Sequence, residues 1–159
     1  MSEAAILARV IHVLGVVIWI GGVGFVTAVV IPACAAMPGP EAAEQFERFE
    51  RRFAWIARAM VLLVGASGLD MLWQFDLWSR FTDAGFWWMH AMVIVWTVFA
   101  IVLFVMEPLL HQRIAARMRR DPQATFRAMR RMHWILLLVS LVTIAGAVAG
   151  AHGYSFSNP

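Results

Sequence analysis

Four long runs of apolar residues alternate with polar segments along this chain of 159 residues. The runs cover residues 6–31, 53–73, 85–110 and 132–151. Each is near or above the roughly 20 residues that an α-helix needs to cross the hydrocarbon core of a bilayer. Because lipid offers the backbone no hydrogen-bond partner, such a segment must be a helix. The pattern therefore predicts an all-α integral membrane four-helix bundle, a single domain over residues 1–159.

The polar segments between the runs, 32–52, 74–84 and 111–131, are expected to be connections. They leave no room for a separate soluble domain, and no internal sequence repeat is evident.

Small residues follow the first run, as they do at a signal-peptide cleavage site. This run is nevertheless longer than the roughly 7–15 apolar residues of a signal peptide. We therefore expect the first run to be retained as a membrane helix.

Composition excludes the main alternatives to a membrane protein. Apolar residues make up 62% of the chain and charged residues 14%, whereas soluble domains are roughly half apolar and a quarter charged. The single cysteine, Cys34, argues against a disulfide-rich secreted fold. The abundance of large apolar residues argues against intrinsic disorder.

The arginines predict which way the helices face. The first connection holds Arg48, Arg51 and Arg52, and the third holds Arg113, Arg117, Arg119, Arg120, Arg127, Arg130 and Arg131. On the opposite side of the predicted helices there are only Arg9 and Arg80. Basic loops stay in the cytoplasm, so both termini are expected on the outer, periplasmic side of a bacterial inner membrane. The basic residues then indicate topology and attraction to membrane lipids, and no nucleic-acid motif competes with this interpretation.

Tryptophans mark the same two boundaries of the membrane. Trp55 and Trp134 fall at the predicted inner boundary, and Trp73, Trp78, Trp87 and Trp88 at the outer one. This distribution is typical of the aromatic belts of membrane proteins.

The five histidines sort by their predicted depth. His12 and His90 lie one to two turns inside the outer ends of the first and third helices, so they reach a similar level. Two imidazoles at one level of a bundle can hold a metal ion or a haem iron. His152, at the outer end of the fourth helix, and Asp70, near that of the second, bring further polar groups to this end.

The other two histidines, His111 and His133, lie at the inner boundary among arginines. We expect them to reach water at the headgroup level, as polar side chains at helix ends do. The alternative is that they hold a second, inner cofactor.

The helix face around His12 favours a flat cofactor. Gly15 and Trp19 share this face, since residues three, four and seven apart lie together on a helix. A histidine, a glycine and a large aromatic residue would provide a ligand, an open space and a wall for a porphyrin. The plainer interpretation is that His12 and His90 are unrelated polar residues, hydrogen-bonded to neighbouring helices.

Copper is an alternative cofactor for the outer site. Met71, Met89 and Met92 lie near the outer histidines, and thioethers suit Cu(I). Methionine is also an ordinary filler of apolar helix interfaces, which makes haem the stronger prediction.

Three short motifs resemble those of a known family, the HemJ-type protoporphyrinogen oxidases and their CopD-like relatives. Ile11-His12 followed by Trp19-Ile20-Gly21-Gly22 is similar to the family's first helix. The segment from Phe46 to Phe53, FERFERRF, resembles the start of its second helix. Trp88-Met89-His90 is similar to the start of its third.

This resemblance implies a haem b bundle, with His12 as the axial ligand and His90 as a second residue of the site. Met92 stands where the family has lysine, and the family's Asn-Glu-Val-Pro segment has no counterpart around His133. These departures favour a haem redox protein over a protoporphyrinogen oxidase. The CopD-like relatives would imply copper handling.

Two axial imidazoles would favour electron transfer over oxygen binding. Asp70 could then orient an imidazole, and Arg9 or Arg80 could pair with the haem propionates. The redox partner would be a quinone, a porphyrinogen or a small donor on the outer side. The sequence leaves open a di-haem cytochrome, in which His152 would join the outer level and His111 and His133 would hold an inner haem. It also leaves open a copper transporter, a non-catalytic assembly factor and a homo-oligomer.

Overall fold

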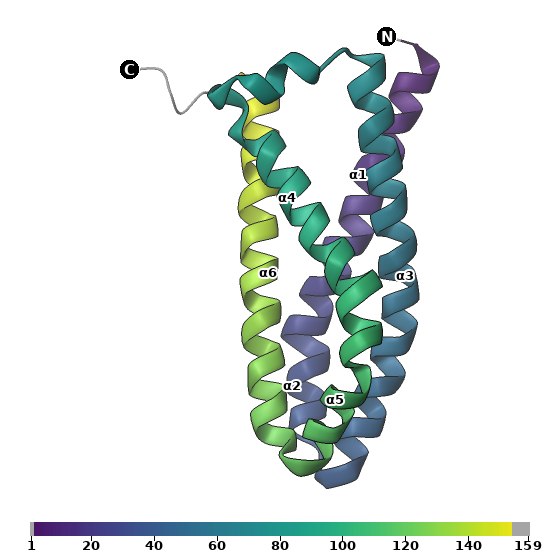
Figure 1. Cartoon of the computed structure of the whole chain (residues 1–159), viewed down its shortest axis with the longest axis vertical. Helices are drawn as coiled ribbons and strands as arrows, with labels where there is room; N and C mark the ends of the chain where they lie inside the picture. The colour runs from purple at the N-terminus through teal and green to yellow at the C-terminus, as the bar shows by residue number, and fades with distance from the viewer. Residues whose placement is uncertain (1, 154–159) are drawn as a thin grey trace.

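The computed structural model describes residues 2–153, and in this part of the chain every element is helical (Figure 1). Four helical spans among these residues are long and apolar enough to cross a membrane. The prediction of an all-α chain with four such helices is therefore confirmed for residues 2–153. The fold is that of a multi-pass membrane protein.

The first and third spans share a construction in three parts. In the first, α1 (Glu3–Phe25) continues through the π-helical turn Val26–Val30 into α2 (Ile31–Ala35). In the third, α4 (Trp87–Ile101) continues through the π-helical turn Val102–Met106 into α5 (Glu107–Arg120).

Proline explains why both π turns lie where they do. Pro32 and Pro108 each follow a π turn by two residues. A proline ring collides with the carbonyl four residues earlier and offers no N–H to the preceding turn. The wider π turn accommodates the ring, so the span bends without being broken.

The second and fourth spans are the long helices α3 (Gly39–Gln74) and α6 (Pro122–Ala151). The predicted connections 32–52 and 111–131 are therefore wrong, because helix continues through most of both segments. Within these two segments the chain leaves the helix only around residues 36–38 and at Asp121. Asp121 caps α6 by accepting a hydrogen bond from the backbone N–H of Ala124 at 2.9 Å.

The middle connection was predicted correctly. Between α3 and α4 the chain forms two short 3-10 helices, Trp78–Thr82 and Ala84–Phe86. Together with residues 75–77 and Asp83 they cross one end of the bundle (Figure 1).

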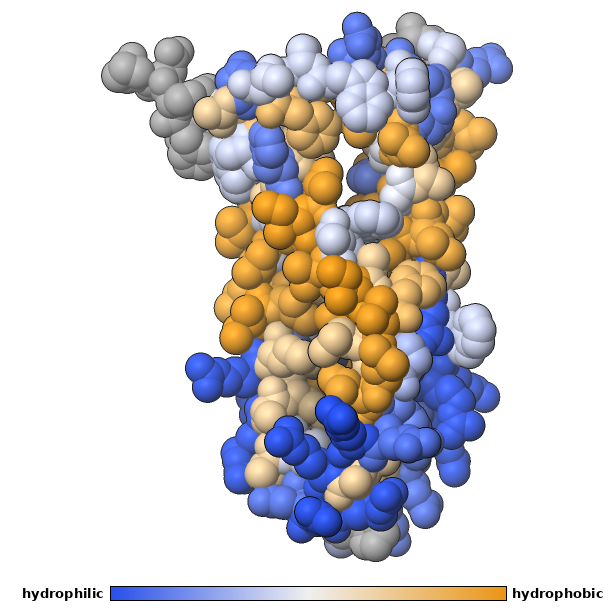
Figure 2. Space-filling view, in the orientation of Figure 1, coloured by the Kyte–Doolittle hydropathy of each residue, from blue (hydrophilic) through white to orange (hydrophobic). Residues whose placement is uncertain are grey.

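The N-terminal end of α1 and the C-terminal end of α6 lie at the same end of the molecule, below called the terminal end (Figure 1). The opposite end, which carries α2, α5 and the starts of α3 and α6, is called the arginine end. A band of apolar surface lies between them, and hydrophilic surface covers the arginine end (Figure 2). Within the band large apolar side chains are exposed, including Val17 (61%) and Ile94 (62%). Such a surface fits lipid and not water.

The buried core occupies the middle of the bundle and its arginine end. One cluster surrounds Trp19, Val61, Phe99 and Leu137. A second lies near the arginine end and consists of Val26, Val30, Ile31, Cys34, Ala42, Phe46, Met118 and Phe126. Neither cluster of the described residues reaches the terminal end.

At the terminal end the helices separate into two pairs, because α4 runs diagonally (Figure 1). It starts against α6, where Trp87 and Trp88 lie over Gly146 and Gly150. It then crosses to α3, where Trp96 donates a hydrogen bond to the carbonyl of Val61 at 2.8 Å. The surface is hollowed between the pairs α1–α3 and α4–α6, beneath the connection 75–86 (Figure 2). We call this opening the hollow.

Against expectation, α3 and α6 share a sequence motif. Arg48-x-x-Arg51-Arg52-x-x-Trp55-Ile56 in α3 matches Arg127-x-x-Arg130-Arg131-x-x-Trp134-Ile135 in α6. Each helix follows a span with a π turn and a proline. The chain is thus two helical hairpins of similar construction, and the expectation of no internal repeat was wrong.

Candidate functional site

His12 is held by α3 across the interface between the first two spans. Its Nδ1 lies 3.1 Å from the carbonyl oxygen of Val64 and 3.3 Å from Oγ of Ser67. The Ser67 hydroxyl donates its own proton to the carbonyl of Leu63 at 2.6 Å, so it can only accept from the imidazole. Both neighbours of Nδ1 are therefore acceptors, and Nδ1 carries the ring proton. Nε2 is left with its lone pair and has no hydrogen bond within residues 2–153.

This arrangement is the one that metal-binding histidines use. They donate one ring N–H to a carbonyl or carboxylate, which fixes the tautomer and the ring orientation, and bind the metal through the other nitrogen. The backbone carbonyl of Val64 fulfils this role, for which the sequence had suggested Asp70.

Glycines bring α1 and α3 close enough for these contacts. A Cβ on Gly68 would lie 3.2 Å from Cε1 of His12, and a Cβ on Gly15 would lie 2.8 Å from Cγ2 of Val64. The expected open space beside Gly15 is therefore wrong, because Val64 of α3 fills it. Gly15 instead allows the close approach that gives His12 its partner.

The residues that sequence reasoning missed form a small-residue run on α3. Gly65, Ala66, Ser67 and Gly68 are consecutive, and both neighbouring spans use them. His12 of α1 packs against Gly68, while the indole of Trp96 from α4 lies over Gly65. Four small residues inside an otherwise large-residue helix were the available signal.

Trp19 is a core residue. It is 3% exposed, and its ring meets Phe99 edge to face at a centroid distance of 4.8 Å. Its indole Nε1 is buried without a hydrogen-bond partner among the described residues. Trp19 thus closes the middle of the bundle toward the arginine end, below the level of His12.

His90 lies near the start of α4, on the other side of the hollow from α1. It is exposed, and its Nε2 donates to the carbonyl of Phe81 at 3.0 Å. Its ring also meets that of Phe81 edge to face at 5.4 Å. The lone pair of His90 is therefore on Nδ1. Within residues 2–153 the partners of His12 are on α3 and that of His90 is in the connection, so the structure records no contact between them.

The other polar groups of the terminal end have partners of their own. Asp70 accepts a hydrogen bond from Nε2 of Gln74 at 2.6 Å, and Oε1 of Gln74 accepts one from Ser2 at 3.1 Å. The guanidinium of Arg9 lies over the ring of Phe75, and that of Arg80 over Phe86. Both arginines therefore border the terminal end of the bundle.

The remaining histidines have local surroundings. His133 and His152 each donate Nδ1–H to the carbonyl four residues earlier in α6, at 2.9 and 2.8 Å. His111 is exposed on α5. Of the predicted copper ligands Met89 is buried, and Met71 and Met92 are half-buried. Across residues 2–153 no three His, Cys, Asp or Glu side chains gather in one place.

No family model matches the chain, and no curated protein or solved structure matches it significantly. Within residues 2–153 the fold is that of an all-α multi-pass membrane protein, and His12 is a histidine bound between two spans by one ring nitrogen, with no hydrogen bond at the other. The geometry around His12 is therefore the basis for a function.

Proposed function

We propose that this protein is a membrane-embedded haem b redox protein and that His12 would hold the haem iron through Nε2. One observation carries the proposal. The Nδ1–H of His12 is bound across the helix interface by Val64 and Ser67, and Nε2 has no hydrogen bond to the part of the chain that the structure describes. An unpaired polar group inside a membrane protein is costly, and such groups mark functional sites.

The surroundings of His12 fit such a group. The terminal end of the bundle is splayed, and among the buried residues of the two core clusters only Val64, the partner of His12, lies at this level. Its walls are helices with apolar side chains, which would shield a flat hydrophobic macrocycle from water. His90 supports the proposal as the second ligand, because it belongs to the opposite wall and only its Nε2 has a hydrogen-bond partner within residues 2–153. The resemblance of Ile11-His12 and Trp88-Met89-His90 to the HemJ-type family points the same way.

The chemistry that haem supplies when bound is one-electron transfer at a potential set by its ligands and burial. The contribution of this chain is to hold the His12 ring in one tautomer, to exclude water and to provide cations at the end of the bundle. Arg9 and Arg80, which border that end, would pair with the propionates, since arginine binds carboxylates in a bidentate fork.

The orientation belongs to the same proposal. With the arginine end in the cytoplasm, both termini and His12 face the outer side of a bacterial inner membrane. The electron partner would then be a membrane quinone, a porphyrinogen or a small donor at that side.

Difference spectroscopy of the purified protein tests the haem assignment. We expect a red protein whose reduced-minus-oxidised spectrum has a sharp Soret and α band, with low-spin ferric haem. His12→Ala should lose at least nine-tenths of this signal while it keeps its helical circular dichroism and elution volume. His12→Gly with added imidazole should regain part of it, since free imidazole can replace the lost ligand.

His133→Ala is the matched control, because it removes another half-buried helical histidine whose Nδ1–H has only a local partner. It should retain the spectrum. A colourless wild-type protein purified from haem-replete cells would overturn the proposal. So would a His12→Ala variant with unchanged absorption.

A further inference from the structure

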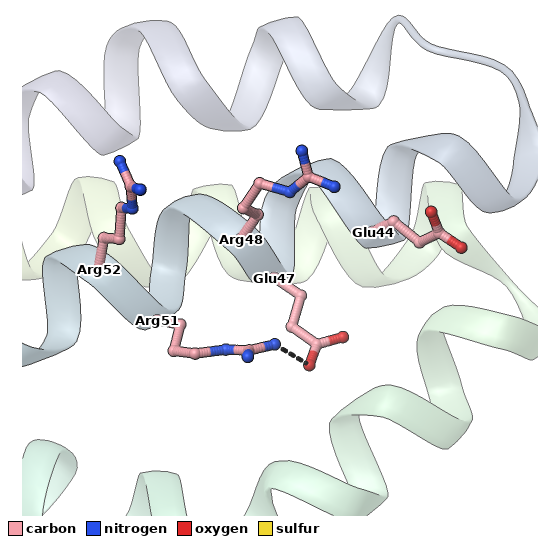
Figure 3. A pocket seen from close by; sticks show the side chains of 5 residues that line it. All are labelled: Glu44, Glu47, Arg48, Arg51 and Arg52. Atoms are coloured by element: carbon pink, nitrogen blue, oxygen red, sulfur yellow. Dashed lines mark hydrogen bonds and ion pairs between the residues drawn. The ribbon is translucent and has the colours of Figure 1, made fainter.

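Two arginines of α3 extend to the same side of the helix at the arginine end (Figure 3). Arg48 and Arg52 are one turn apart and exposed, and within residues 2–153 neither has an ion pair or a hydrogen bond. Arg51 points the other way and pairs with Glu47 at 3.1 Å. Together with Glu44 these residues line a shallow pocket of about 460 Å³. The lining carries three arginines and two glutamates, so the pocket has one positive charge more than its carboxylates balance.

An apolar groove of about 210 Å³ also lies at the arginine end, and two of its lining residues come from the same stretch of α3. The groove is formed by the end of the first span, with Phe25, Val29 and Met37, and by Gln45 and Phe49 of α3. Gln45, Arg48, Phe49 and Arg52 have the spacing 0, 3, 4 and 7, which places them on one face of α3. Arg48 and Arg52 therefore share the face of α3 that carries Gln45 and Phe49 of the groove.

The apolar wall of the groove is exposed. Phe25 is 58%, Val29 50% and Phe49 45% exposed. The ring of Phe53 lies over Gly22, so this part of α3 packs on the last turns of α1. The groove lies where the apolar first span reaches the arginine end. An apolar surface with adjacent free cations at such a boundary is complementary to a lipid with a negative headgroup.

We propose that Arg48 and Arg52 bind the phosphate of an anionic phospholipid whose acyl chain lies in the groove of Phe25, Val29 and Phe49. Arginine suits this role because its planar guanidinium binds phosphate oxygens in a bidentate fork. The methylenes of the lipid cover apolar side chains that water would otherwise meet. This site is independent of the haem assignment, because it lies at the opposite end of the bundle from His12.

The internal repeat supplies a matched control. Arg127 and Arg131 of α6 correspond to Arg48 and Arg52, and they too are exposed and without an ion pair within residues 2–153. The groove is lined by the first span and α3 alone. Two double variants therefore remove the same charge from equivalent positions, and only one of them removes it beside the groove.

Native mass spectrometry of the full chain, with phosphatidylglycerol and phosphatidylcholine titrated into detergent, tests the site. We expect the wild-type protein to retain phosphatidylglycerol in preference to phosphatidylcholine. Arg48→Gln/Arg52→Gln should bind it roughly thirtyfold more weakly, about fivefold for each lost charge near the membrane surface. Arg127→Gln/Arg131→Gln should bind it within about threefold of wild type. Phe49→Ser should also weaken retention, since it removes apolar wall while every arginine remains.

Equal loss in the two double variants would overturn the proposal, because it would mean unspecific attraction to the basic surface. Equal retention of phosphatidylcholine and phosphatidylglycerol by wild type would overturn it too. Glycerol phosphate, which has no acyl chain, should not compete at millimolar concentration, and effective competition would assign the arginines to a free phosphate instead. Elution volume and helical circular dichroism establish that each variant is folded.

Discussion

At the scale of single residues, the position of His12 depends on the small side chains around it. Gly15 lets α3 approach, Gly68 leaves space for the imidazole ring, and Ser67 and Val64 offer acceptors to Nδ1. None of these residues would be conspicuous alone. Their effect comes from two helices that meet at a distance only small residues permit. The ring orientation is therefore a property of the α1–α3 interface.

Gly68→Ala tests this dependence. The added Cβ would lie 3.2 Å from Cε1 of His12, so the ring must shift by a few tenths of an ångström and its hydrogen bond to Val64 must lengthen. Losing a partner that orients a ligand costs about 10- to 100-fold in metal affinity. We therefore expect haem retention during purification to fall, as measured by the pyridine haemochrome per mole of protein.

Gly21→Ala is the control for this variant. Nothing lies within 4 Å of a Cβ at Gly21, and alanine favours a helix by about 1 kcal/mol over glycine. Gly21→Ala should keep its haem and unfold at the same temperature as wild type or slightly higher. If Gly68→Ala behaves in the same way, the close contact at His12 has no functional consequence.

At the scale of elements, the π turn Val102–Met106 is connected to α3 by a charged side chain. In a π turn the carbonyl of Leu103 would accept from residue 108, but Pro108 has no N–H. Nε of Arg58 donates to this carbonyl at 3.2 Å, and its guanidinium also pairs with Glu107. Arg58 thus satisfies a backbone group that the proline leaves unpaired. This explains a charged residue inside an apolar helix.

Arg58→Met should therefore destabilise the bundle strongly. It leaves Glu107 without its partner and the Leu103 carbonyl without a donor, and breaking a largely buried ion pair typically costs about 3–5 kcal/mol. The cost would appear as a lower unfolding midpoint in a denaturant titration in detergent micelles. The double variant Arg58→Met/Glu107→Gln should regain part of the loss, because it removes the unpaired charge. Equal midpoints for Arg58→Met and wild type would show that the pair does not stabilise the fold.

At the scale of the whole molecule, the charge distribution and the shape agree. Hydrophilic surface covers the arginine end, and both termini of the described chain lie at the other (Figures 1 and 2). Helix continues past the apolar runs into the arginine end, where a second core cluster around Ile31 and Phe126 holds the extensions together. The protein therefore has a membrane-spanning half and a helical base built from the same four spans.

Cysteine labelling tests the orientation. Cys34 is buried (2% exposed), so it is a poor probe and should first be replaced by alanine. Ser79→Cys in the connection and Ala128→Cys in α6 then introduce exposed thiols at the two ends. We expect a membrane-impermeant maleimide to label intact spheroplasts at position 79 and not at 128. The reverse pattern would invert the proposed topology.

The sequence by itself determined the four membrane spans, because apolar runs longer than a bilayer's width leave the backbone no alternative to helix. It also placed the arginines at one end, since the run boundaries show on which side each falls. It underestimated the helices' length, because the polar extensions pack on one another and not on lipid. Only the tertiary structure decided that His12 faces Val64 and Ser67, that Gly15 is covered and that α4 crosses diagonally. Those outcomes depend on which small residues meet across an interface, and periodicity along one helix does not specify that.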